Sequence, residues 1–187
     1  MKSLPVGIQD FKDLVSRNCL YVDKTRFLVE LVERGKVFFL SRPRRFGKSL
    51  TVSKLFYLFS GQRELFEGTF IHDHWDWKPH PVVRLSMNLI NSESAESVKK
   101  GLMFHLNLVA SSYGLTIDNT DVSTAFFHLL YQLSSRGGVT VLVDEYESPI
   151  LDNLREPEKA ESIRRVLRTF YGTLKDADPY LRFLFLT

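Results

Sequence analysis

The stretch that decides the fold of this chain reads Ser41-Arg42-Pro43-Arg44-Arg45-Phe46-Gly47-Lys48-Ser49. It follows the apolar run Val37-Phe38-Phe39-Leu40 and precedes a helix-like run that begins Leu50-Thr51-Val52. An apolar strand, a short loop ending in Gly-Lys-Ser and a helix form the pattern of a phosphate-binding loop. Backbone N–H groups at the start of such a helix lack partners and point at one spot, which therefore carries partial positive charge.

Three residues of this stretch have separate chemical roles in the predicted site. Gly47 lets the backbone approach phosphate oxygens, Lys48 adds a positive charge, and the hydroxyl of Ser49 is a ligand for Mg²⁺. The full phosphate-loop pattern begins with a glycine, and that position is Arg42. Gly-Lys-Ser alone is weak support, so the alternative at this point is a basic loop that leads into an ordinary helix.

A second motif favours the phosphate site. The run Val139-Thr-Val-Leu-Val143 is apolar and β-branched, and it ends in Asp144-Glu145. A continuous apolar run of this length predicts a buried parallel strand, and ligands of such sheets bind at the carboxyl ends of the strands. We expect Asp144 to hold Mg²⁺ and Glu145 to orient and deprotonate an attacking water. The alternative is that the two carboxylates cap the next helix or solvate a turn.

The composition limits the class of protein. The 187 residues are 44% hydrophobic and 25% charged, which is typical of one soluble globular domain, and the net charge of +3 makes no general case for nucleic acid. The single cysteine, Cys19, excludes an internal disulfide and fits a cytoplasmic protein. No apolar run approaches the roughly 20 residues of a membrane-spanning helix, so no membrane partner is expected.

The chain predicts strands that alternate with helices, which means a three-layer α/β/α sandwich with a mainly parallel sheet. We expect a single domain over 1–187, with 1–20 partly irregular and 61–80 a connecting segment. Because the chain stops at Thr187, just after a strand, we also expect a fold truncated at its C-terminus or the front part of a longer polypeptide; a compact variant is the alternative. The predicted strands are 37–41, 81–86, 139–143 and 181–186, and the predicted helices are 24–35, 47–60, 93–113, 121–136 and 157–175.

Four segments together resemble a known family over essentially the whole chain. They are Tyr21-Val22-Asp23-Lys24-Thr25, Arg42-Pro43-Arg44-Arg45-Phe46-Gly47-Lys48-Ser49, Leu65-Phe66-Glu67-Gly68 and Val143-Asp144-Glu145-Tyr146. The sequence resembles the AAA-ATPase-like family, whose members are mainly bacterial and archaeal and are often joined to a C-terminal PD-(D/E)XK nuclease-like domain. An arginine at the first-glycine position is normal in that family, so Arg42 counts less against nucleotide binding.

The resemblance implies a P-loop NTPase fold in which strand 139–143 lies beside strand 37–41. It implies ATP and Mg²⁺ as cofactors, with Lys48 and Glu145 as catalytic residues and Ser49 and Asp144 as Mg²⁺ ligands. A polar sensor residue is expected just beyond strand 182–186, and the sequence departs from the family there, because it has only Thr187. The implied cofactor-binding residues are Arg42, Pro43, Arg44, Arg45, Phe46, Gly47, Lys48, Ser49 and Leu50, together with Asp23, whose segment resembles the element that flanks the adenine.

Two function classes are consistent with these motifs. The first is an ATP-binding and ATP-hydrolysing domain that drives conformational change in attached or partner domains, with a homo-oligomer supplying an arginine from a neighbouring subunit. The second is a non-catalytic nucleotide-dependent or nucleic-acid-binding module that uses Arg42, Arg44, Arg45 and Lys48 to grip a phosphate backbone. His72-Asp73-His74 with His80 is a weaker metal candidate, because zinc sites usually use wider spacings that include cysteine; a surface loop is the alternative.

Overall fold

The computed structural model describes residues 2–43, 45–118 and 120–187. In these residues the sheet has four strands, all parallel, in the order β1-β4-β3-β2. The prediction of an α/β fold with a parallel sheet is therefore confirmed. The strands are β1 (Val37–Phe39), β2 (Val82–Ser86), β3 (Val139–Asp144) and β4 (Leu181–Leu186).

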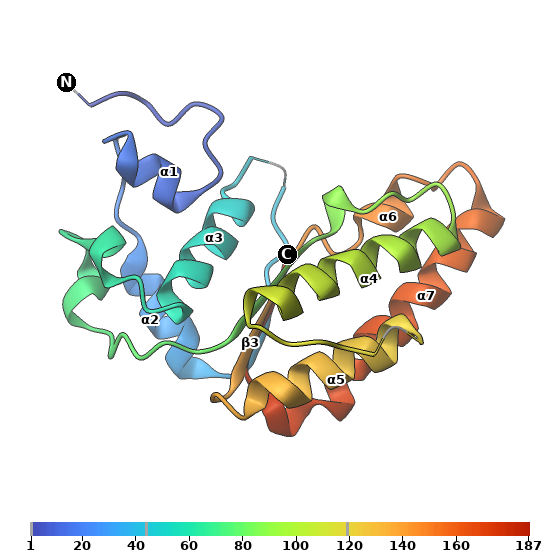
Figure 1. The fold of residues 1–187 in the computed structure, drawn as a ribbon. Coiled ribbons are helices and arrows are strands. Elements are labelled where there is room, and N and C mark those ends of the chain that lie inside the picture. The colour runs from blue at the N-terminus through green and yellow to red at the C-terminus, as the bar shows by residue number, and fades with distance from the viewer. Residues whose placement is uncertain (1, 44, 119) are drawn as a thin grey trace.

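Helices cover both faces of the sheet, as Figure 1 shows. One face packs against α4 (Ala95–Ser112), α5 (Val122–Ser134) and α7 (Pro157–Asp176), and the other against α3 (Lys48–Phe59) with α1 (Phe11–Ser16) and α2 (Thr25–Arg34) beyond it. The short elements are α6 (Ser148–Leu151), η1 (Arg63–Phe66), η2 (Phe70–Asp73), η3 (Met87–Leu89) and η4 (Asp178–Tyr180).

Alternate residues of the strands pack into two hydrophobic cores, one on each face of the sheet. Val141 and Val143 of β3 belong to the core under α4, α5 and α7, whereas Leu142 between them belongs to the core under α3. Strand side chains alternate between faces, so a strand covered on both sides needs apolar residues at every position. This explains why β3 is a continuous apolar run and why all six of its residues are buried.

The strand order implied by the family resemblance, with strand 139–143 beside strand 37–41, is wrong. Strand β4, and not β3, pairs with β1, in the register Val37↔Leu184, and β4 pairs with β3 on its other side. The physical reason is burial: β4 supplies Leu184 to one core and Phe183 to the other, which suits an interior strand. Strand β1 has only three residues, and Val37 and Phe39 are more than half exposed, as is tolerable at a sheet edge.

The helix boundaries reflect local signals that the sequence carries. Ser94 accepts a hydrogen bond from the backbone N–H of Ser97 at the start of α4, and Asp121 does the same for Ser123 at the start of α5. Such caps satisfy N–H groups that have no partner inside the helix. The predicted helices are therefore found within a few residues of their expected ends, whereas α1 and α6 were not predicted.

Candidate functional site

The loop after β1 leads directly into the first turn of α3. Gly47 precedes that turn with φ of 77°, a left-handed conformation that glycine adopts readily. A Cβ atom added to Gly47 would meet no atom within 4 Å, so open space lies beside the backbone here. The first N–H groups of α3 have no acceptor inside the helix, which makes this space suitable for an anion.

Lys48 is held by two contacts. Its Nζ donates a 3.1 Å hydrogen bond to the backbone carbonyl of Arg42 and lies 3.6 Å from Oε1 of Glu145. The side chains of Lys48 and Glu145 are only 11% and 21% exposed, so little water screens this ion pair. The pair joins the residue after the loop glycine to the residue after β3, and so brings one residue of each sequence motif into contact.

Asp144 ends β3 and is 6% exposed. The hydroxyl of Thr187 donates a 2.6 Å hydrogen bond to Oδ1 of Asp144 and accepts one of 3.2 Å from the backbone N–H of Glu145. The backbone N–H of Thr187 in turn donates to the carbonyl of Val143 at 2.9 Å. Thr187 therefore fixes both carboxylate-bearing residues, from the end of the strand that lies next to β3.

Glu145 has left the strand conformation. Its φ of 55° is positive, which is uncommon for a residue other than glycine. This turn directs the chain away from β3, and Glu145 lines the same cavity as Lys48. A strained backbone at a residue that faces a cavity is typical of functional sites.

A cavity of about 780 Å³ opens in front of this loop. It is large enough for a ligand of nucleotide size, because small-molecule sites occupy roughly 300–1,000 Å³. Its lining comes from the N-terminal segment, from the loop with the first turn of α3, and from the ends of two strands. The lining residues are Val6, Gly7, Ile8, Gln9, Arg45, Gly47, Lys48, Ser49, Leu50, Asn88 and Glu145.

The structure brings together most of the predicted site residues. Arg45, Gly47, Lys48, Ser49, Leu50 and Glu145 line the cavity. Asp144 lies directly before Glu145 but is not itself part of the lining. Arg42, Pro43 and Phe46 are exposed in the loop without lining the cavity, and Arg44 lies outside the described residues.

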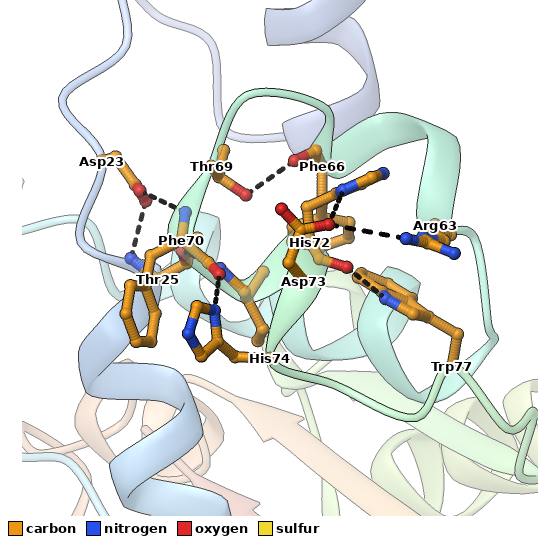
Figure 2. A network of polar contacts seen from close by, with 11 residues as sticks. Asp23, Thr25, Arg63, Phe66, Thr69, Phe70, His72, Asp73, His74 and Trp77 are labelled. Atoms are coloured by element: carbon orange, nitrogen blue, oxygen red, sulfur yellow. Dashed lines mark hydrogen bonds and ion pairs between the residues drawn. The ribbon is translucent and has the colours of Figure 1, made fainter.

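Asp23 lies apart from the cavity lining, in the network of Figure 2. Its carboxylate accepts hydrogen bonds from the backbone N–H groups of Thr25 at 2.8 Å and Phe70 at 2.7 Å. Burial raises the pKa of Asp23, but these backbone bonds and the nearby charge of Lys54 together lower it. In this structure Asp23 fastens η2 to the start of α2.

The histidines of 72–74 are also engaged in local contacts (Figure 2). His72 Nδ1 lies 2.8 Å from Oδ1 of Asp73, and His74 Nδ1 donates a 2.7 Å hydrogen bond to the carbonyl of Phe70. The ring of His74 also stacks on that of Phe70, with centroids 3.9 Å apart. Over the described residues, no three His, Cys, Asp or Glu side chains form a group suited to a metal ion.

The donors present nevertheless fit a magnesium ion that arrives with a nucleotide. Magnesium keeps several waters and takes only one or two protein ligands in such sites, the rest being phosphate oxygens. The hydroxyl of Ser49 and the carboxylate of Asp144 are hard oxygen donors of this kind. The hydrogen bond from Thr187 goes to Oδ1 of Asp144 and does not occupy Oδ2.

Sequence reasoning missed the N-terminal wall of the cavity, Val6 to Gln9, and also Asn88. Asn88 lies just after β2, and its Oδ1 accepts a 2.5 Å hydrogen bond from the hydroxyl of Ser148. The only available signal for Asn88 was its place just beyond the carboxyl end of a predicted strand. Nothing local distinguishes 6–9, because only the packing of α1 on α3 brings this segment to the loop.

No helix in the described ranges combines the length and the apolar character needed to cross a membrane.

No solved structure matches the chain. A curated protein of Azotobacter chroococcum mcd 1, named "Uncharacterized protein in vnfD 5'region", is 42% identical over 190 residues. That alignment covers 100% of this chain but 37% of the relative, so the chain spans little more than a third of the relative's length. The family described as "Predicted AAA-ATPase" matches residues 5–187, and the chain belongs to this AAA-ATPase-like family.

Proposed function

We propose that residues 1–187 form one P-loop domain that binds ATP with Mg²⁺ in the cavity in front of α3. The observation that supports this most strongly is the shared lining of that cavity. Gly47, Lys48 and Ser49 from one motif and Glu145 from the other meet there, although they lie far apart in the sequence. The family's description as a predicted ATPase is consistent with the same ligand.

The phosphates are bound by the start of α3 in this proposal. Backbone N–H groups of the loop and of the first turn of α3 donate to phosphate oxygens, and Lys48 exchanges its contact with Glu145 for one with phosphate. Ser49 and Asp144 hold Mg²⁺, which supplies charge neutralisation when bound. Arg45 lines the cavity and adds a further positive charge to the loop.

The N-terminal segment provides the wall for the nucleoside. Val6 and Ile8 offer apolar side chains and Gly7 an open backbone, with no atom within 4 Å of an added Cβ. Apolar contacts with a base and a few backbone hydrogen bonds are what ligand pockets of this kind supply. This assignment replaces Asp23 with segment 6–9 as the candidate for the base-proximal element.

Hydrolysis is the second step of the proposal. Glu145, once released by Lys48, holds and deprotonates a water for in-line attack on the γ-phosphate. Thr187 fixes the backbone of Glu145 and the carboxylate of Asp144. We further propose that a neighbouring subunit of a homo-oligomer in the cytoplasm supplies an arginine that completes the site.

ATP turnover would drive conformational change in attached or partner domains. The Azotobacter relative is much longer than this chain. We therefore assign the conformational change to the whole protein, in which a C-terminal nuclease-like domain is the proposed partner of the ATP-binding domain. The alternative is a nucleic-acid-binding module without catalysis. Its support is that Arg42 and Arg45 are exposed in the loop.

The test is equilibrium binding of ATP by the parent chain and by Lys48→Ala, with and without Mg²⁺. Loss of one charge-assisted phosphate contact should weaken ATP binding by more than about tenfold. Lys36→Ala is the matched control, because Lys36 pairs with Asp178 and does not line the cavity. If Lys48→Ala binds ATP like the parent, the proposal is wrong; DNA affinity with a steep salt dependence, unaffected by ATP, would favour the alternative.

A further inference from the structure

The carboxylate of Asp10 gathers contacts from two other elements. Its Oδ2 accepts a 2.8 Å hydrogen bond from the hydroxyl of Ser53, and the phenol of Tyr57 lies 3.0 and 3.1 Å from its two oxygens. Nη1 of Arg84 lies 3.8 Å from Oδ2. Burial raises the pKa of Asp10, but the bonds from Ser53, the Asp13 N–H and Tyr57, together with the charge of Arg84, lower it on balance.

Ser53 makes this connection in both directions. Its hydroxyl donates to Asp10 and accepts a 2.9 Å hydrogen bond from the backbone N–H of Phe11. Phe11 is fully buried, with its ring centroid 4.8 Å from that of Phe66 and 5.4 Å from that of Tyr21. The chain at 10–11 is therefore fixed to α3 by polar contacts above an aromatic cluster.

The position of this clasp, formed by Asp10, Ser53 and Tyr57, relates it to the cavity. Asp10 comes directly after Gln9, the last residue of the cavity wall formed by 6–9. Ser53 and Tyr57 lie on α3, the helix whose first turn carries Lys48 and Ser49. One carboxylate thus ties the wall of the cavity to the helix whose first turn lines the same cavity.

The wall itself has few contacts of its own. Val6 is 86% exposed, and Gly7 has φ of 76° with open space around it. Ile8 is half-buried, and the N–H of Val6 and of Ile8 donate only to the nearby carbonyls of Leu4 and Pro5. A short segment with local contacts of this kind loses its geometry easily, because ordering each residue costs conformational entropy. The segment is held from two sides: the carbonyl of Ser3 accepts a 2.8 Å hydrogen bond from the N–H of Leu20, and Asp10 anchors the end that adjoins Gln9 to α3.

We propose that Asp10 is a positioning residue for the nucleotide: it holds segment 6–9 in place as part of the lining that the cavity shares with the phosphate loop. It contributes to binding of the nucleoside and leaves the phosphate contacts of Lys48 and Ser49 unchanged. The physical basis is preorganisation, since a wall already in place pays no ordering cost when the ligand arrives. This inference rests on the proposed ATP site.

A purely structural role for Asp10 predicts that its substitution weakens the binding of ATP and of inorganic tripolyphosphate by the same factor. Asp10 also caps α1, because its Oδ1 accepts from the backbone N–H of Asp13 at 3.1 Å. Asp10→Ser keeps a side chain that caps helices well but is too short to reach Ser53 and Tyr57. Tyr57→Phe removes one hydroxyl of the clasp and keeps the ring.

The experiment compares two probes, ATP and inorganic tripolyphosphate, by titration calorimetry in the presence of Mg²⁺. In Asp10→Ser and Tyr57→Phe, ATP binding should weaken by about tenfold or more, and tripolyphosphate binding should change less than about twofold. Asp13→Asn, which disturbs α1 through its exposed pair with Arg17, should bind both probes like the parent.

Several outcomes would overturn the inference. If both clasp variants bind ATP like the parent while Lys48→Ala loses it, the ATP site stands and the role of Asp10 is refuted. If ATP and tripolyphosphate weaken by the same factor, Asp10 supports only the fold. If the parent binds neither probe, the proposed ATP site fails and the role of Asp10 fails with it.

Discussion

Nζ of Lys48 lies 3.6 Å from Oε1 of Glu145, and both side chains are largely buried beside the cavity. The two opposite charges offset each other at a place where little of either side chain is exposed to solvent. In the proposed ATP site, a phosphate would compete with Glu145 for the ammonium group of Lys48, which would couple phosphate binding to release of the carboxylate. Under the proposed function, Glu145 would be freed to act as the base when a phosphate takes its place beside Lys48.

Glu145→Gln should retain ATP binding and lose turnover. The amide still fits the site but competes less strongly for Lys48, so ATP affinity should stay equal or rise. Turnover should fall by at least about 100-fold, the contribution of a general base. Binding calorimetry and phosphate release measure the two effects, and Glu147→Gln, a change at a carboxylate outside the cavity lining, is the control. Turnover equal to that of the parent would remove Glu145 from this role.

Thr187→Val should destabilise the protein and reduce Mg²⁺-dependent turnover. Valine has a similar volume but no hydroxyl, so Oδ1 of the buried Asp144 loses its 2.6 Å donor. Loss of one partner of a buried carboxylate costs about 1–3 kcal/mol in the free energy of unfolding. Thr187→Ser keeps the hydroxyl and should behave nearly like the parent in urea unfolding. A Thr187→Val variant as stable as the parent would show that the hydrogen bond to Asp144 contributes little to stability.

Gly47→Ala should weaken ATP binding more than it weakens the fold. The left-handed conformation of Gly47 costs about 1–2 kcal/mol for a residue with a Cβ atom. That Cβ would also occupy the open space beside the phosphate loop. Gly172→Ala is a matched control, because Gly172 lies inside α7 with free space around it, and alanine should stabilise there by about 0.5–1 kcal/mol. Thermal unfolding and ATP titration separate the two effects, and unchanged ATP affinity in Gly47→Ala would contradict the placement of phosphate.

The stability of the parent should rise with pH between about 8 and 10 because of Lys54. Burial lowers the pKa of Lys54 from 10.5 to about 8, so the unfolded chain binds more protons than the folded one in this window. Stability therefore increases as pH rises through 8, by about 2 kcal/mol up to pH 10. Above that, Tyr21 and Tyr57, whose pKa values are raised to about 12, act in the opposite direction.

The control for this pH dependence is Lys54→Met, which keeps an unbranched side chain without a charge. The difference in unfolding free energy between Lys54→Met and the parent should shrink from pH 8 to pH 10. A difference that stays constant over this window would show that Lys54 titrates normally in the folded protein.

The elements of the fold could be predicted because their signals are local. Ser94 and Asp121 mark helix starts by capping, and the apolar run 139–143 marks a strand covered on both faces. The sequence also predicts that the loop at 41–49 and Asp144-Glu145 form one site, because parallel strands place their carboxyl ends at one edge of the sheet. The ion pair between Lys48 and Glu145 comes from the structure alone. Strand order could not be predicted, since the apolar residues of β3 and β4 suit either interior position.

The N-terminal part of the site illustrates the same limit. Asp23 looked like a base-proximal residue from its motif, yet its carboxylate is bonded to the backbone of Thr25 and Phe70. Segment 6–9 has no comparable motif and nevertheless lines the cavity. A sequence motif indicates which residues act together, but it does not indicate which atoms each side chain contacts.

The sequence by itself determined the parallel α/β architecture and the two motifs that converge on Lys48 and Glu145, because hydrophobic patterns and helix caps act over a few residues. The tertiary structure alone decided that β4 separates β1 from β3, that Thr187 bonds Asp144, and that Asp10 holds the N-terminal wall on α3. These contacts join residues far apart in the chain, and only the packing of helices on both faces of the sheet brings them together.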